Sequence, residues 1–213
     1  MLLRRAAAAV ALFAAASAAH AQFVINEGFD NVASLTSRGW VVTNASSPLG
    51  STGWFQGDQT IFTSQAGAPQ AYIAANFNNA AAGGTLANWL ISPTFSTQDA
   101  GFVSFHARAD ILPEFMDQLA WGFSKGGTSF ADFTLGAPHT IGGAWTQFQI
   151  NFAAQGAGST GRFAIVYTGP GDLANYVGVD TFAVAVPEPE TWTLMLAGLA
   201  GLAVLKRRRA TRS

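Results

Sequence analysis

Apolar and polar residues alternate with a period of two along much of the chain. Val103, Phe105 and Ala107, for example, are interleaved with Ser104 and His106. The same alternation is found at residues 71–77, 103–108, 119–123, 147–152, 163–167 and 177–180. A period of two is typical of a β-strand that buries one of its faces. The pattern therefore predicts a series of short, half-buried strands.

Glycine-rich breaks separate the predicted strands. Gly83-Gly84, Gly126-Gly127 and Gly142-Gly143 are the clearest of them, and we expect each to form a turn. No sustained helical period occurs between residues 22 and 186. Many short strands with turn signals between them predict an all-β fold, an antiparallel β-sandwich, and the jelly roll is the usual way of closing one of this length. The phenylalanines and tryptophans would then fill the space between the two sheets.

The N-terminus has the layout of a secretory signal peptide. Arg4 and Arg5 precede the apolar run 6–19, and Ala19-His20-Ala21 places small residues where a signal peptidase reads them. We therefore assign residues 1–21 to a signal peptide and expect the mature chain to begin at Gln22.

The C-terminus joins Pro187-Glu188-Pro189 to a short apolar run and a basic cluster. The prolines prevent a helix from running through the triplet, so a helix can begin only after it. The apolar run 192–205 has about 14 residues and would span about 21 Å as a helix, against a hydrocarbon core of about 30 Å. Lys206, Arg207, Arg208 and Arg209 would stay on the cytoplasmic side, which leaves the triplet on the outer face.

This tail, residues 187–213, resembles the PEP-CTERM sorting signal. The resemblance implies that an exosortase recognises the triplet, removes the transmembrane helix after its transient insertion in the inner membrane, and passes the protein to the cell surface or extracellular matrix of a Gram-negative bacterium. The alternative is an ordinary short stop-transfer helix.

The segment between the signals, residues 22–186, has the length of one domain. It holds four basic residues against ten acidic ones, so the near-neutral charge of the whole chain conceals an acidic domain. Nucleic-acid binding is disfavoured, because phosphate contacts need clustered lysine and arginine. The chain has no cysteine, which excludes disulfides and thiol chemistry.

Several spaced motifs of this domain resemble the choice-of-anchor J family, which looks related to cleaved-adhesin and MAM-like jelly rolls of cell surfaces. They are Asn26-Glu27-Gly28-Phe29-Asp30, Gly39-Trp40, Trp54-Phe55-Gln56-Gly57, residues 72–77, residues 88–93, residues 145–148 and residues 176–180. The resemblance covers nearly the whole domain and implies a fold and a location rather than an activity.

The same resemblance implies a structural calcium ion. Related jelly rolls often hold calcium between an early glutamate and a late aspartate, and the matching positions are Glu27 and Asp180. A hard cation prefers such carboxylate oxygens. Asp30 is a weaker candidate, because on a strand it would face away from Glu27. The alternative is that both acids are solvated at strand ends, or pair with Arg38 or Arg162.

Catalysis is not predicted. Asp110, Glu114 and Asp117 could supply a carboxylate pair for glycoside hydrolysis, but a proline-containing connection is also a usual place for solvated acids. His106 and His139 stand in no metal-ligand or nucleophile context, so a zinc site or a serine triad is disfavoured.

Exposed aromatic side chains could bind sugars, because planar rings stack on the apolar faces of pyranoses. The residues that we single out are Trp40, Trp54, Phe55 and Gln56. Packing in the core is the competing and favoured role for each tryptophan.

The sequence therefore predicts a non-enzymatic, exported surface or matrix protein with a role in adhesion or biofilm. A glycan-binding module is the alternative, which predicts an exposed aromatic platform beside Asn or Gln, and an exported glycosidase is a third hypothesis.

Overall fold

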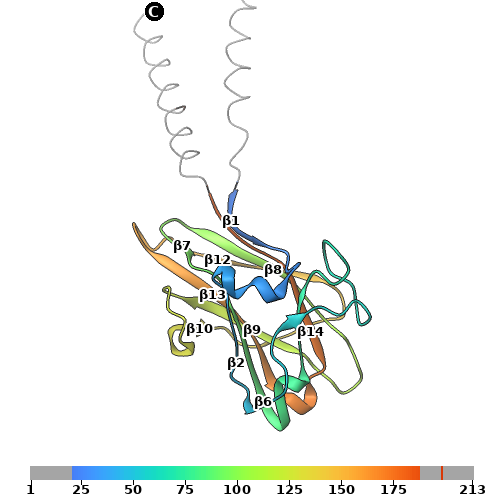
Figure 1. The fold of residues 1–213 in the computed structure, drawn as a ribbon. Coiled ribbons are helices and arrows are strands. Elements are labelled where there is room, and N and C mark those ends of the chain that lie inside the picture. The colour runs from blue at the N-terminus through green and yellow to red at the C-terminus, as the bar shows by residue number, and fades with distance from the viewer. Residues whose placement is uncertain (1–20, 188–197, 199–213) are drawn as a thin grey trace, which may run out of the picture. The chain divides into compact units, whose positions relative to one another are not determined.

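Two antiparallel β-sheets form the framework of the computed structural model, which describes residues 21–187 and 198 (Figure 1). One sheet has six strands: β1 (Ala21–Glu27), β4 (Phe55–Gln56), β5 (Ile73–Asn76), β8 (Gly101–Ala109), β12 (Thr146–Phe152) and β14 (Tyr176–Pro187). The other has eight: β2 (Val41–Asn44), β3 (Ser47–Leu49), β6 (Ala80–Ile91), β7 (Phe95–Ser96), β9 (Gln118–Ser124), β10 (Thr134–Leu135), β11 (His139–Thr140) and β13 (Thr160–Pro170). The described helices are short 3-10 turns: η1 (Val32–Ser34), η2 (Thr36–Arg38), η3 (Phe77–Asn79), η4 (Phe130–Asp132) and η5 (Gly171–Leu173).

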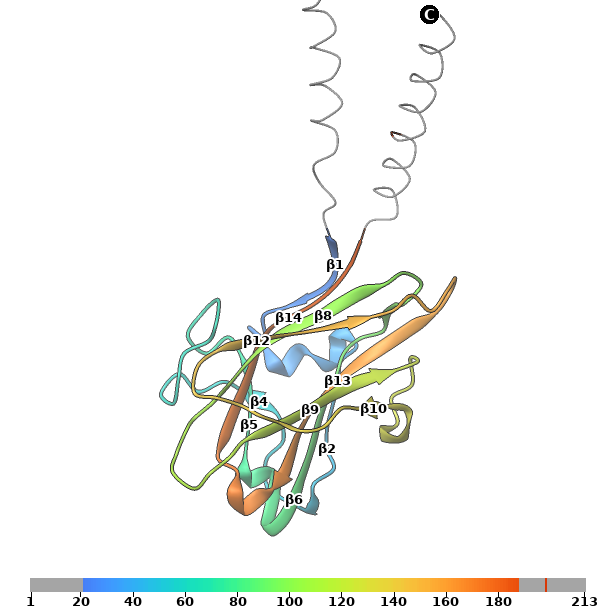
Figure 2. The same cartoon turned by 180° about the vertical axis from the view of Figure 1, so that it is seen from behind.

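Strands that are distant in the sequence are neighbours in both sheets. The first sheet has the order β12-β8-β14-β5-β4 with β1 beside β14, and the second has the order β10-β9-β13-β6-β2 (Figure 2). Neighbouring strands along both of these orders run antiparallel. The predicted all-β jelly-roll sandwich is thus confirmed.

Residues 23–185 form one compact unit with a hydrophobic core of its own. The domain is therefore expected to fold without the two terminal segments. Residues 1–22 and 186–213 belong to a second unit, most of which lies outside the described residues, as do the predicted signal peptide and C-terminal helix. In the described part of the chain, no helix has the length and apolar character needed to cross a membrane.

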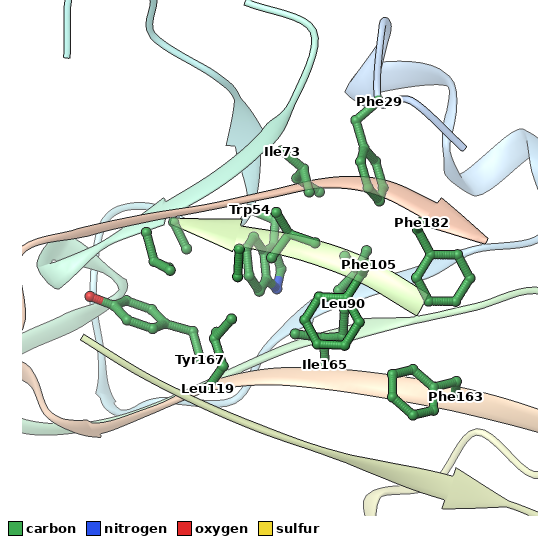
Figure 3. Close-up of a cluster of buried hydrophobic side chains, with 14 of the residues drawn as sticks. Phe29, Trp54, Ile73, Leu90, Phe105, Leu119, Phe163, Ile165, Tyr167 and Phe182 are labelled. Carbon is green, nitrogen blue, oxygen red and sulfur yellow. The ribbon is translucent and has the colours of Figure 1, made fainter. Parts of the chain in front are cut away.

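The core lies between the sheets and is built from the inward-facing residues of the predicted alternation. Phe105 on β8, Phe163 on β13 and Phe182 on β14 are completely buried there (Figure 3). The ring of Trp40 lies 5.0 Å from that of Phe182 in an edge-on contact. Since burying one such side chain contributes roughly 1.5–3 kcal/mol, these rings dominate the stability of the domain.

A bulge in β14 changes which residues face the core. Val177 and Val179 point inward as the alternation predicts, but the register shifts between Asp180 and Ala183. Thr181 takes a left-handed backbone conformation there, with φ of 50°. The extra residue places Phe182 and Val184 in the core, at positions that a regular strand would turn outward.

The long strand β6 departs from the sequence prediction. Gly83-Gly84 lies within this strand, so the turn expected there is wrong. β6 is paired with β13 on one side and with β2 and β3 on the other, and it buries residues of both faces toward its end. Its sequence, rich in Ala and Gly, shows no regular alternation of large apolar and polar side chains.

Candidate functional site

A pocket of about 390 Å³ lies where β14 begins. Its lining comes from η3, the start of β6, η5 and the segment that connects β8 to β9. Figure 1 shows the orange η5 beside the green start of β6 at this end of the domain. Pockets that bind small ligands commonly begin at about this volume.

Backbone hydrogen bonds hold these four segments together around Asn175. The backbone N–H of Phe77 donates to the carbonyl of Asn175 at 3.0 Å, and the side-chain amide of Asn175 donates to the carbonyl of Asp110 at 2.9 Å. The N–H of Met116 donates to the carbonyl of Leu173 at 2.6 Å. Gly171 approaches β6 so closely that a Cβ atom there would lie 3.2 Å from the carbonyl oxygen of Gly84. The pocket is therefore a fixed part of the fold.

Asp117 is a buried residue next to the pocket that holds its backbone in place. Its carboxylate is 2 % exposed and accepts hydrogen bonds from the backbone N–H groups of Asn175, at 2.9 Å, and Tyr176, at 3.3 Å, as well as from the Tyr167 hydroxyl. Burial raises the pKa of Asp117 above its usual range, although these donors act in the opposite direction. The side chain holds η5 and the start of β14 in place and is not available to a ligand.

Large apolar side chains are exposed on the segments that contribute to the pocket. Six of the eleven exposed large hydrophobic residues of the described chain belong to η3, η5 or the connecting segment: Phe77, Ile111, Leu112, Phe115, Met116 and Leu173. Each has between 44 % and 58 % of its surface accessible. We call this set the apolar end. A concentration of exposed apolar side chains on a soluble domain typically marks an interaction site.

Polar groups stand beside the two pocket phenylalanines, Phe77 and Phe115. Asn78 has no side-chain hydrogen bond among the described residues, so its amide is available as donor and acceptor. The Asp172 carboxylate accepts the N–H of Gly83 at 3.0 Å and 3.1 Å and keeps lone pairs for further donors. Aromatic faces, an amide and a carboxylate thus converge on one pocket.

A second and larger depression, of about 970 Å³, lies between the ends of β9 and β12. Its aromatic residues, Phe123 and Phe152, already have aromatic neighbours, because their rings are 5.8 Å apart and Phe123 also contacts the core ring of Phe163 at 4.9 Å. The first pocket is therefore the stronger candidate site.

The tryptophans singled out for sugar binding are buried. Trp40 is 4 % exposed and Trp54 is 7 % exposed, and both belong to the main core. An exposed platform built on these residues is therefore contradicted by the structure. The reason is that a sandwich of this size needs large side chains between its sheets, and packing is the role that the two rings serve.

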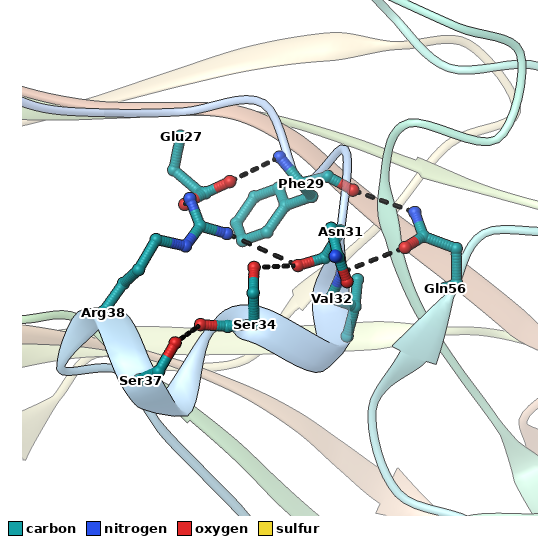
Figure 4. A network of polar contacts seen from close by, with 8 residues as sticks. All are labelled: Glu27, Phe29, Asn31, Val32, Ser34, Ser37, Arg38 and Gln56. Carbon is teal, nitrogen blue, oxygen red and sulfur yellow. Dashed lines mark hydrogen bonds and ion pairs between the residues drawn. The ribbon is translucent and has the colours of Figure 1, made fainter.

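Phe55 and Gln56 also serve the fold. Phe55 packs 6.0 Å from the ring of Tyr176. The Gln56 amide donates to the carbonyl of Phe29 at 2.8 Å and accepts the N–H of Val32 at 2.9 Å (Figure 4). It also donates to the carbonyl of Gln70 at 2.7 Å. This side chain ties the segment after β1 to β4, and its hydrogen-bonding groups are used.

Glu27 pairs with Arg38, one of the alternatives that the sequence left open. The Arg38 guanidinium lies 2.5 Å from the Glu27 carboxylate, whose other oxygen accepts the N–H of Phe29 at 2.8 Å (Figure 4). Glu27 is 5 % exposed, so its charge needs this partner. Asp30 is exposed.

Asp180 is fully buried rather than solvated at a strand end. The segment after β4 folds over it, and the N–H groups of Gln65 and Ala66 donate to its carboxylate at 2.8 Å and 3.1 Å. The N–H of Thr181 donates at 2.5 Å, and burial raises the pKa of Asp180. Both carboxylates of the predicted calcium site thus face hydrogen-bond donors, which is not the donor set of a cation site. Within the described residues, no three acidic or histidine side chains are grouped as metal ligands.

The remaining titratable candidates are dispersed. Glu114 is exposed, Asp110 is half-buried against Asn175, and Asp117 is buried, so the three acids do not share one accessible position. His139 stacks on Trp121 with ring centroids 4.2 Å apart. His106 lies on β8, and partial burial lowers its pKa. One feature of the sequence could have predicted this pocket: residues 111–116 contain four large apolar side chains in a segment expected to connect two strands. Residues of such connections that face solvent are usually polar.

The tail has a recognised motif. Residues 185–210 match the PEP-CTERM protein-sorting motif. Of the predicted sorting residues, Pro187 is the last one of the β14 strand, while Glu188, Pro189, Lys206, Arg207, Arg208 and Arg209 lie outside the described residues. The chain thus carries the signal of an exported protein sorted to the cell surface. No curated protein matches the sequence.

The domain has the fold of cleaved-adhesin domains. It is similar to the K1 cleaved adhesin domain of Lys-gingipain from Porphyromonas gingivalis, with a TM-score of 0.57 and 19 % identity over 77 % of this chain and 98 % of that one. The K3 cleaved adhesin domain of the same protein gives a TM-score of 0.55 and 15 % identity over 78 % of this chain and 100 % of that one. At such identities the likeness establishes a shared sandwich fold.

Proposed function

We propose that this chain is an exported, non-catalytic surface protein of the choice-of-anchor J type, which an exosortase sorts and which takes part in adhesion or in a biofilm matrix. Its domain would hold an extracellular polysaccharide in the pocket of the apolar end. The observation that carries the proposal is a pocket lined by two exposed phenylalanines, Phe77 and Phe115, together with an amide and a carboxylate.

Sugar rings suit this combination of groups. The C–H face of a pyranose is apolar and can pack on a phenyl face such as that of Phe115, which carries partial negative charge. The ring hydroxyls can donate to the Asp172 carboxylate, and the Asn78 amide can both donate and accept. An anionic polymer would meet Asp172 and an acidic domain, so a neutral glycan fits better.

The position of the pocket supports a display function. The pocket lies at the start of β14, next to Asn175, whereas the sorting tail continues from the end of the same strand. At about 3.3 Å per residue, the length of β14 separates the two by about 35 Å. The pocket and the first residue of the sorting motif thus lie near opposite ends of β14.

A screen of immobilised glycans with the purified domain, residues 22–186, tests the proposal. We expect saturable binding to a neutral glycan, reduced at least about tenfold by Phe115→Ala and by Asn78→Ala, because each removes a free contact group. Phe23→Ala is the matched control, since Phe23 is 58 % exposed and lies on β1. Absence of binding to any glycan, or binding that both pocket variants leave unchanged, would contradict the proposal. If the two pocket variants bind normally but Trp54→Ala loses glycan binding, the site predicted from the sequence at Trp54 would be favoured instead.

A further inference from the structure

β12 is the outer strand of the six-stranded sheet and is paired on one side only. Its seven residues pair with β8 from Thr146 opposite Ala107 to Phe152 opposite Gly101 (Figure 2). The backbone groups on its other side have no hydrogen bond within the described residues. An open strand edge of this length can add a strand from another chain.

The usual protections of an open edge are absent here. β12 contains no proline, glycine or charged residue, and the whole segment 141–161 is uncharged in a domain with ten acidic residues. Its outward row, Gln147, Gln149 and Asn151, is exposed and consists of amides. Soluble proteins commonly place lysine, proline or a bulge on such an edge to prevent pairing.

The inner face of β12 leaves apolar surface uncovered. Phe148, Ile150 and Phe152 pack against the core but are only partly buried. On the neighbouring strand β8, Phe105 and Val103, which lie opposite Phe148 and Ile150, are completely buried. A further strand beside β12 would cover the apolar side chains that the sandwich leaves half-exposed.

The strand is complementary to itself in the antiparallel sense. Pairing two copies about Gln149 places Phe148 opposite Ile150 on the inner face and Gln147 opposite Asn151 on the outer face. Thr146 then lies opposite Phe152 at the ends of the pair, and no like charges meet across it. A two-fold interface of this kind uses the same surface of both copies.

From these observations we infer that β12 is a self-association edge, through which two copies of the domain join their six-stranded sheets into one continuous antiparallel sheet. The occupant of the edge is thus a second copy of this chain, paired at Gln149. This inference rests on β12 and is independent of the pocket at the apolar end.

Sedimentation velocity of the 22–186 domain over a range of concentrations tests the inference. We expect reversible dimerisation, weakened at least about tenfold by Q149K, because the two introduced charges would face each other across the two-fold axis. Gln149 is exposed, so the substitution should leave the fold intact. Q98K, at an exposed position outside β12, is the matched control and should dimerise as the wild type does.

A mixing experiment separates edge pairing from other causes. Q149K and Q149E should each be monomeric alone and should form a heterodimer when mixed, because opposite charges would then face each other. A wild-type domain that is monomeric at its highest soluble concentration would overturn the inference. So would dimerisation that Q149K leaves unchanged or that Phe115→Ala abolishes, and so would failure of the two charged variants to pair.

Discussion

Asp117 is the residue on which the geometry of the pocket depends. Its buried carboxylate collects the Tyr167 hydroxyl and two backbone N–H groups at the start of β14. Such a carboxylate loses hydration on folding, and its donors compensate only in part, which is why its pKa is raised. A residue whose spacing suggested catalysis therefore has a structural role.

The pH dependence of stability should report this burial. Because the pKa of Asp117 is higher in the folded than in the unfolded state, its contribution to the free energy of unfolding falls as pH rises from about 4 through the folded pKa. Above that range the contribution is constant. Urea unfolding at several pH values should show a smaller decline in Asp117→Asn, which cannot titrate, than in the wild type. Asp99→Asn, at an exposed position, is the control; equal declines in Asp117→Asn and wild type would contradict this assignment.

Arg38 forms an ion pair with Glu27, one of the two acids that the sequence suggested as calcium ligands. Since the carboxylates of Glu27 and Asp180 already have protein partners, we expect the melting temperature to be the same in calcium and in chelator. Removing the partner in Arg38→Met should cost about 1–2 kcal/mol, less than for a fully buried pair, because the Arg38 side chain is 44 % exposed. A calcium-dependent rise in melting temperature that Glu27→Gln abolishes would show that the calcium prediction is right.

At the scale of elements, alternation predicted the strands that turn one row of large apolar side chains toward the core. Residues 103–108, 119–123, 147–152 and 163–167 were found in β8, β9, β12 and β13. In β13 the opposite row, Ala164 and Val166, is buried as well. β6 was not predicted, because its end is buried on both faces and because Gly83-Gly84, which lies within it, was expected to form a turn. The burial of Asp180 could not be predicted either, because it depends on a loop that covers the outer face of the sheet. The candidate site was missed for the same reason: it combines segments near residues 77, 115 and 172 that only the tertiary fold brings together.

Gln56 on the short strand β4 tests whether a residue predicted to bind sugar has a structural role instead. Gln56→Ala would leave the backbone groups of Phe29, Gln70 and Val32 without their side-chain partner. We expect a loss of about 1–3 kcal/mol in unfolding free energy, measured by urea denaturation, with glycan affinity unchanged. Gln98→Ala, which removes an exposed amide, should alter neither quantity. Weaker glycan binding at unchanged stability would place Gln56 in the ligand site instead.

At the scale of the whole molecule, one strand links the two functions that we propose. β14 begins beside the pocket and runs toward the PEP-CTERM motif, which matches residues 185–210. Residues 22–186 carry ten acidic and four basic residues, while the other seven basic residues lie in the two terminal segments. The sorting tail was recognisable from the sequence because it is a linear motif, whereas the pocket is a product of folding.

Processing of the tail should depend on the triplet itself. In a host that contains an exosortase, we expect Glu188→Ala to remain in the membrane fraction at its unprocessed mass, because the recognised triplet is broken. Glu190→Ala lies just beyond the triplet and should be processed normally. Fractionation followed by mass spectrometry distinguishes the two products. Normal processing of the Glu188 variant would indicate a sorting route that does not read the triplet.

The most direct test of the account is the adherence of intact cells to a surface coated with the glycan identified in the screen. Cells that display the wild-type protein should adhere, whereas cells that display the same amount of Phe115→Ala should adhere no better than cells that lack the protein. Phe23→Ala should behave as the wild type. Equal adherence of the Phe115→Ala and wild-type cells would contradict the claim that the apolar end is the adhesive site.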